Sequence, residues 1–167
     1  YEGNNTANFI GDIIHGPHYF ATLFRNHFDG QSHNALQVNE NSGIVLLAHN
    51  RFFNIIGNVI GWSGYGTYSS GTGASATAIY VLGDQGTATD GMGGTTTPVG
   101  DDTHVSRTLL RACNWDNVTS SNDTGTNDST GTKNDAAEAP TSITNYPNPV
   151  VASCATLPAS LYLSSKP

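Results

Sequence analysis

Leu23-Phe24-Arg25-Asn26-His27-Phe28 and Leu47-Ala48-His49-Asn50-Arg51-Phe52 follow one pattern, with leucine, asparagine and phenylalanine at matching places and an offset of 24 residues. A second pair of segments, 9–14 and 55–60, matches at an offset of 46, close to two such periods. Repeats of about 20 to 50 residues are typical of solenoids, in which each unit buries its apolar side by stacking on its neighbours. The period therefore predicts an all-β chain that winds as a parallel β-helix with few coils.

Alternation along the two copies assigns side chains to an inner and an outer face. The inner face is expected to carry phenylalanine and asparagine: Phe20, Phe24, Asn26, Phe28, Asn50 and Phe52. The outer face is expected to carry Tyr19, Leu23, Arg25, His27, Leu47, His49 and Arg51. An offset of 24 then stacks Asn26 under Asn50 and Phe28 under Phe52, so that the asparagine amides form a hydrogen-bonded ladder between coils.

The rest of the chain is divided by composition. Residues 1–61 are predicted to form regular coils, and 62–106 a loop excursion with one strand, Ala78–Leu82. Residues 107–118 are expected to add a further coil wall, and 119–167 a tail and cap packed along the solenoid, with a last strand at 157–163. Loops as long as the excursion are usually functional or disordered, and they often wall one face of a solenoid.

Composition narrows the class of protein. The 167 residues fit one domain, and 6 Lys and Arg against 13 Asp and Glu give a net charge of -7. So few cations disfavour nucleic acid as a partner. No stretch approaches the roughly 18 apolar residues of a membrane span. Sparse charge and many short polar side chains favour a secreted, extracellular protein, and a start at Tyr1 indicates a mature or excised piece.

Two cysteines, Cys113 and Cys154, allow one bridge. In an extracellular protein we expect them to form a disulfide that ties the last coil to the tail. The chain-entropy model values such a loop at about 3 to 4 kcal/mol. The alternative is two buried free thiols.

The stretch from Thr108 through Val118, with the later stretch 157–167, resembles the C-terminal end of secreted bacterial right-handed parallel β-helix proteins of the pectate-lyase-like superfamily. Segment 119–150, rich in Thr and Asp, departs from that pattern. The resemblance implies a right-handed solenoid. It does not choose among the lyases, hydrolases, esterases, adhesins and phage spikes of this architecture. Since a solenoid needs about three repeats and polar caps, the first coil is expected to contact N-terminal coils of a longer protein or a homo-oligomeric neighbour.

The candidate catalytic residues are Arg25, His27, His49 and Arg51. The offset of 24 predicts Arg25 beside His49 and His27 beside Arg51, on strands about 4.8 Å apart. Such a cationic cluster suits an anionic partner, and it supplies the base and the cation that a polysaccharide lyase needs. The alternative is an ordinary solvated β-face. Paired carboxylates for a glycoside hydrolase would have to come from Asp12, Asp29 and Glu40.

Aromatic and turn residues supply further candidates. Trp62, Tyr65 and Tyr68 are candidate substrate-binding residues that stack on sugar rings, although Trp62 can instead close the preceding coil. The histidines of the turns, His15, His18 and His33, are candidate bases or metal ligands, or turn residues held by the backbone. No zinc motif accompanies them, and we expect no metal or other cofactor. Calcium at 101–104 is a weak alternative, since that segment lacks the calcium-loop motif.

Two functions from different classes follow. The first is an extracellular carbohydrate-active module that binds, and in an enzyme cleaves, a polysaccharide along the solenoid face. The second is a structural surface, filament or adhesin protein that self-associates without catalysis. The sparse charge, the abundance of Thr, Ser, Asn and Gly, and the absence of a recognisable first cap favour this second function.

Overall fold

The computed structural model describes residues 1–13, 15–31, 42–61, 67–70, 78–84, 102–116 and 121–123. Within these residues nearly all regular structure is β-strand, and one short helix, α1 (His104–Arg107), is present. The strands are β1 (Asn5–Thr6), β2 (Phe9–Gly11), β3 (Thr22–Phe24), β4 (His27–Phe28), β5 (Ile44–Leu46), β6 (Asn54–Ile56), β7 (Val59–Ile60), β8 (Thr67–Ser70), β9 (Ala78–Leu82), β10 (Leu110–Ala112), β11 (Asn114–Asp116) and β12 (Ser121–Asp123). The prediction of an all-β chain is confirmed.

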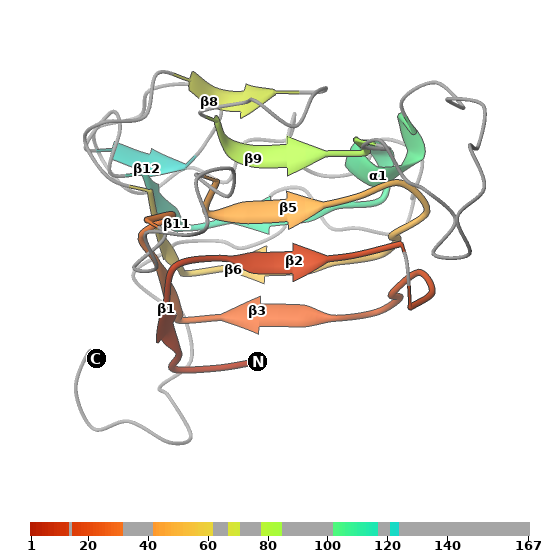
Figure 1. The fold of residues 1–167 in the computed structure, drawn as a ribbon. Helices are drawn as coiled ribbons and strands as arrows, with labels where there is room; N and C mark the ends of the chain where they lie inside the picture. Colours follow the sequence, from red (N-terminus) through yellow and green to blue (C-terminus); the bar gives the residue numbers. More distant parts are fainter. Residues whose placement is uncertain are drawn as a thin grey trace.

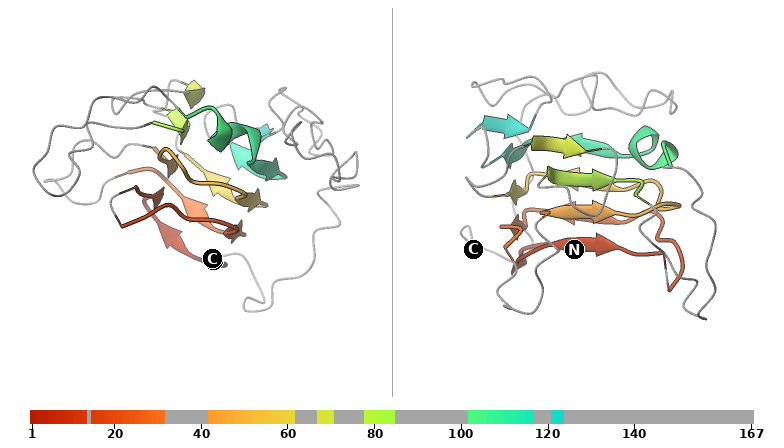
Figure 2. Two further views of the ribbon diagram at one scale, coloured as in Figure 1. Left: turned by 90° about the vertical axis from the view of Figure 1, so that its right-hand side faces the viewer. Right: turned by 45° about the horizontal axis from the view of Figure 1, so that its top comes forward.

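The strands form three sheets, and the chain visits the sheets in turn. One sheet has the order β2-β5-β9-β8, the second β10-β6-β3, and the third β1-β4-β7-β11-β12. Every strand pair is parallel except β11 with β12. Figure 1 shows β3 and β2 low in the view, with β5, β9 and β8 stacked above β2. Two further views confirm the stacking of the strands in each sheet (Figure 2).

The predicted offset of 24 residues is wrong. Leu23 pairs with Ile55 and not with Leu47, and Phe28 pairs with Ile60 and not with Phe52. Hydrogen-bonded asparagines at equivalent places on neighbouring strands are separated by 22, 32 and 56 residues. The spacing grows because the connections between the sheets lengthen along the chain.

The two matching segments are alike for a different reason. Arg25 and His49 both have positive φ, at 55° and 70°, and each directly precedes a buried asparagine. The shared pattern is therefore one local turn motif that is used at two different bends of the backbone. Residue 25 lies between β3 and β4, whereas residue 49 lies between β5 and β6.

Positive φ also explains why some side chains were assigned to the wrong face of their strands. Leu23 is fully buried, although alternation placed it outside, and Phe20 is 75% exposed, although alternation placed it inside. Phe20 and Phe52 have φ of 60° and 59°. A left-handed residue interrupts the alternation of an extended chain, so side chains on its two sides no longer keep one phase. Asn26, Phe28 and Asn50 are buried as predicted.

The core consists of apolar side chains from all three sheets and from the segment around α1. Stacked pairs in register include Leu23 with Ile55, Phe28 with Ile60, and Leu46 with Leu82. Burial of each such side chain is worth roughly 1.5 to 3 kcal/mol. The buried members are Leu23, Phe28, Ile44, Leu46, Phe53, Ile55, Ile60, Ile79, Tyr80, Leu82, Val105 and Leu109.

A ladder of four asparagines runs along the bend between the second and third sheets. The predicted stacking of Asn26 on Asn50 is wrong, because Asn50 lies at the other bend. Its members are Asn4, Asn26, Asn58 and Asn114. Each of the last three accepts, at Oδ1, both the backbone N–H and the Nδ2 of the asparagine before it, at 2.8 to 3.0 Å. We call the four positions, each with its preceding residue, the asparagine corner. All four preceding residues, Gly3, Arg25, Gly57 and Cys113, have positive φ.

The remaining expectations have mixed outcomes. Ala78–Leu82 is a strand as predicted, while β8 and α1 are additional elements of the excursion. The segment 107–118, predicted to add a further coil wall, contains β10 and β11 with a bend at Cys113. Cys154, His33, Glu40 and 157–163 lie outside the described residues, so the disulfide and the last strand stay predictions. No helix in the described part of the chain is long and apolar enough to cross a membrane.

Candidate functional site

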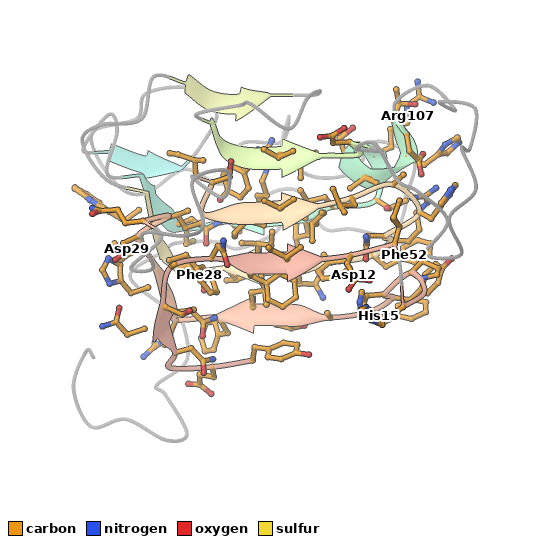
Figure 3. The ribbon with its side chains drawn as sticks, in the orientation of Figure 1. Asp12, His15, Phe28, Asp29, Phe52 and Arg107 are labelled. Atoms are coloured by element: carbon orange, nitrogen blue, oxygen red, sulfur yellow. The ribbon has the colours of Figure 1, made fainter. Side chains whose placement is uncertain are left out.

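The polar and aromatic side chains of interest gather at one bend of the backbone, between the first and second sheets. We define the histidine corner as residues 12–13, 15–20, 47–53 and 102–108, which connect β2 to β3, β5 to β6 and β9 to β10. Asp12, His15, Phe52 and Arg107 lie at one end of the strands, opposite Phe28 and Asp29 (Figure 3). Four of the six histidines belong to this corner: His15, His18, His49 and His104.

Asp102 is the centre of the polar contacts in the histidine corner. Its Oδ2 accepts the backbone N–H of His49 at 2.8 Å and the Nη2 of Arg51 at 2.6 Å. Its Oδ1 accepts the backbone N–H of His104 at 3.0 Å. The side chain of Asp102 is only 8% exposed, so these bonds replace water around a buried charge. One carboxylate thus ties the turn before β6 to the turn that begins α1.

These bonds set the ionisation of Asp102. Burial of the carboxyl raises its pKa, but the N–H groups of His49 and His104 and the Arg51 guanidinium outweigh burial and lower the pKa of Asp102 to about 2. Asp12, at the edge of the corner, has its pKa lowered by hydrogen bonds from the side chain and backbone N–H of His15. Both carboxylates are therefore ionised at neutral pH.

An exposed aromatic platform lies on the turns that carry His18 and Arg51. The rings of Phe20 and Phe52 are stacked, with centroids 5.0 Å apart and an interplanar angle of 6°. Tyr19, 50% exposed, lies beside Phe20 at 6.5 Å. The backbone N–H of Phe20 donates to the carbonyl of Arg51, so the platform and the ion pair share one backbone connection. We call Tyr19, Phe20 and Phe52 the aromatic platform.

The platform is held in unfavourable backbone conformations. Positive φ costs an L-residue roughly 1 to 2 kcal/mol, and a bulky residue there is a genuine outlier. Glycine fills two of the four such positions in the asparagine corner but only one of four, Gly16, in the histidine corner, where Phe20, His49 and Phe52 fill the other three. Strained residues cluster at functional sites, which makes this corner the stronger candidate.

A buried asparagine supports the corner from below. Asn50 is fully buried, accepts the backbone N–H of His18, and donates to the carbonyls of Gly11 and Leu47. A Cβ at Gly11 would lie 2.8 Å from Asn50 Oδ1, so glycine leaves the space that Asn50 occupies. The turns that carry His18 and His49 are thereby joined.

The predicted cationic cluster does not form, because the offset on which it depended is wrong. His27 pairs with Asn5 and Val59, and its Nδ1 lies 2.8 Å from Asn5 Oδ1. Arg25 belongs to the asparagine corner, where its guanidinium lies 5.0 Å from the centroid of the Phe24 ring. His49 and Arg51 are in the histidine corner, and their nearest anion is Asp102.

Other predicted site residues have separate outcomes. Trp62 and Tyr65 lie outside the described residues, and Tyr68 lies on β8. Asp102, considered for calcium, instead accepts hydrogen bonds from N–H groups. In the described part of the chain, no group of three or more His, Cys, Asp or Glu is arranged to hold a metal ion.

Sequence reasoning missed the platform because alternation placed both phenylalanines inside. Phe20 precedes Phe52 by 32 residues, the same spacing that separates Asn26 from Asn58, and this shared spacing was the available sequence signal for the stacked pair.

Comparison of the chain with protein-family models, curated proteins and solved structures finds no significant match.

Proposed function

We propose that this protein is a right-handed parallel β-helix that binds a polysaccharide chain at the histidine corner. The helix is supported by the rotation of the chain through three sheets, in which β3, β4 and β5 pair in parallel with β6, β7 and β9. Right-handedness follows from the strong preference of parallel crossovers.

The observation that carries the binding proposal is the exposed aromatic platform. Phe20 presents an open ring at 75% exposure, and Phe52 lies flat behind it. Flat apolar rings pair with the apolar faces of sugar rings, and neighbouring polar groups bind the hydroxyls. His49 and Arg51, on the turn that carries Phe52, supply such groups.

Binding without cleavage is the simpler proposal. Arg25 and His27 are at a different bend from His49 and Arg51, and the guanidinium of Arg51 is engaged by Asp102 and by the Asn50 carbonyl. A cation committed to a buried carboxylate is less free to stabilise charge that develops on a substrate.

Affinity electrophoresis through gels that contain single polysaccharides tests the proposal. Phe20→Ala should abolish retardation by the polysaccharide that retards the wild type. Trp115→Ala is the matched control, because Trp115 is a 41% exposed aromatic on β11, away from the corner. Equal loss in both variants, or no loss in Phe20→Ala, would remove the platform from the binding site.

Self-association is a second candidate. β1, β2 and β3 are each the last strand at one end of their sheets, and an edge strand offers backbone groups to another chain. Sedimentation over a dilution series tests this function, and a monomer at every concentration would exclude it.

A further inference from the structure

We propose that residues 1–6, which we call the first coil, are a docking surface for one more coil of a β-helix. The occupant is a strand–bend–strand segment from outside residues 1–167 that runs parallel to the first coil and carries an asparagine at its bend. This inference is independent of polysaccharide binding, and it differs from self-association because the partner is not a second copy of the chain. Its basis is the asparagine ladder, which has a direction and ends at an exposed member.

The direction of the ladder follows from its hydrogen bonds. Asn26 donates its backbone N–H and Nδ2 to the Oδ1 of Asn58, and Asn58 donates the same two groups to the Oδ1 of Asn114, with all four bonds at 2.9 Å. Asn4 donates to Asn26 in the same way. Each step thus joins two donors of one coil to one acceptor of the next coil along the chain. A coil stacked on the free side of residues 1–6 would donate the same pair of groups to the Oδ1 of Asn4.

Asn4 differs from the other members of the ladder. It is exposed, whereas Asn26, Asn58 and Asn114 are at most 2% exposed. Within the described part of the chain its Oδ1 accepts no hydrogen bond, although the Oδ1 of each other member accepts two. The other three also donate Nδ2 to a carbonyl of the preceding coil at 2.9 to 3.2 Å. In Asn4 this group reaches only the Glu2 carbonyl of its own coil, at 3.4 Å. A docked coil would supply both kinds of partner.

The backbone of β1 presents an open edge on the same side. The carbonyls of Asn4 and Thr6 accept the N–H groups of His27 and Asp29, so they point toward the next coil. Backbone groups alternate in direction along a strand, so the N–H and the carbonyl of Asn5 point to the opposite side. β1 is the last strand of its sheet at this end. An edge of this kind can pair with an added strand, as in peptide recognition by strand addition.

The apolar interior also ends in an exposed ring here. Phe53, Phe9 and Tyr1 form a row of edge-to-face contacts, with ring centroids 6.0 and 5.4 Å apart. Phe53 is buried, whereas Tyr1 is 72% exposed. The N-terminus lies below β3 (Figure 1), and Glu2 forms a parallel bridge with Phe24 of that strand. An apolar side chain of a docked coil would cover the Tyr1 ring and extend the row.

A second copy of the chain does not present such a coil in its described part. At the far end of the third sheet, β12 pairs with β11 in the antiparallel direction, next to Asn114. Two copies related by a two-fold axis would bring their first coils together with antiparallel strands. Antiparallel pairing does not reproduce the parallel register in which one Oδ1 accepts both an N–H and an Nδ2. The partner is therefore a parallel segment with its own asparagine bend.

A synthetic peptide of residues 21–30 is the probe, because it contains β3, Asn26 and β4. Fluorescence anisotropy of the labelled peptide measures its affinity for the full chain, and NMR follows hydrogen exchange of the Asn5 backbone amide. We expect saturable binding and slower exchange of that amide in the complex, because the docked strand accepts its hydrogen bond. Absence of saturable binding, or unchanged exchange in the complex, overturns the inference.

A pair of variants tests the contact between the two asparagines. Asn4→Ala in the protein and Asn26→Ala in the peptide should each weaken binding about tenfold, since each removes about two hydrogen bonds. Because the two changes share one bond, the combined loss should be smaller than the product of the single losses. Asn54→Ala, which removes an exposed bond to Thr22, is the matched control and should keep the affinity.

Two further outcomes would contradict the inference. Unchanged affinity in Asn4→Ala, or losses that multiply when the variants are combined, would show that the two asparagines do not meet. A dimer of the chain alone in which the Asn5 amide is already protected would assign the surface to a second copy. Neither outcome bears on the gel retardation that tests polysaccharide binding, because that test is made without the peptide.

Discussion

The asparagine corner and the histidine corner are both sharp bends between two parallel sheets, but they direct their side chains differently. The asparagine corner turns its polar groups inward, where Asn26, Asn58 and Asn114 are buried and bonded to one another. The histidine corner buries Asn50 and Asp102 in the same way but turns aromatic rings and imidazoles outward. A bend that only has to be stable needs no exposed phenylalanine, and this difference between the corners is the reason for placing the proposed binding site at the histidine corner.

The largest expected effect is at the asparagine corner. Asn58→Ala should lower the free energy of unfolding by about 4 kcal/mol, because it leaves the buried backbone N–H of Asn26 without its acceptor and removes the side-chain bonds to the Leu23 carbonyl and to Asn114 Oδ1. Urea denaturation followed by circular dichroism measures the loss. Asn54→Ala, on the same stretch of chain but with an exposed bond to Thr22, is the control and should cost under about 1 kcal/mol. Equal losses of unfolding free energy in the two variants would show that the buried ladder stabilises the protein no more than an exposed side-chain hydrogen bond does.

The next effect concerns how closely the backbone packs at the histidine corner. Gly83 has a φ of 78°, and a Cβ there would collide with the backbone carbonyl oxygen of Asp102. Gly83→Ala should therefore cost about 3 kcal/mol, from the left-handed conformation and the displaced segment together. Because Asp102 moves with that segment, the same variant should weaken polysaccharide binding. Gly16→Ala is a control for the conformation alone, since φ is 104° but nothing lies near its Cβ. Equal costs for the two variants would contradict the collision.

The contrast between the corners also explains how far the sequence predicts the fold. Apolar runs punctuated by glycine indicated β-structure, and the recurrence of Leu-x-x-Asn predicted buried asparagines on strands, whereas the structure places each of these asparagines at a bend. Sequence could not tell which of two bends each copy occupied. Arg25 and His49 both adopt left-handed conformations, which residue type does not announce. The predicted strand register was therefore wrong, and the cationic cluster that depended on it does not form.

The candidate site was predicted in part for the same reason. His49 and Arg51 lie in the histidine corner, but their partner is Asp102, separated from them by 53 and 51 residues along the chain. No sequence periodicity links residues across the segment between β7 and β10. Only the folded backbone brings that carboxylate to the corner.

A smaller effect tests the electrostatic centre of the histidine corner. Asp102→Asn should lower the free energy of unfolding by about 1 to 2 kcal/mol at neutral pH. The folded-state pKa of Asp102, about 2, is below the ordinary value of 3.8 for an aspartate, so its charged form is stabilised by folding. This contribution is fully present above about pH 4 and disappears as the pH falls through about 2. Stability curves of the two proteins should therefore converge at low pH. A gap that stays constant down to about pH 2 would show that the loss comes from shape and not from charge.

The smallest effect on stability should accompany a large effect on binding. Phe20→Gly relieves a left-handed residue, worth roughly 1 to 2 kcal/mol, and gives up the stack on Phe52, worth about 0.5 to 1.5 kcal/mol. The two terms nearly cancel, so the free energy of unfolding should change by less than about 1 kcal/mol while polysaccharide binding falls at least about tenfold. Phe28→Gly, in a buried strand of the asparagine side, should instead cost about 4 kcal/mol or more. If Phe20→Gly destabilised the protein as strongly as Phe28→Gly, the ring would be part of the core, and its strained backbone would need no ligand to explain it.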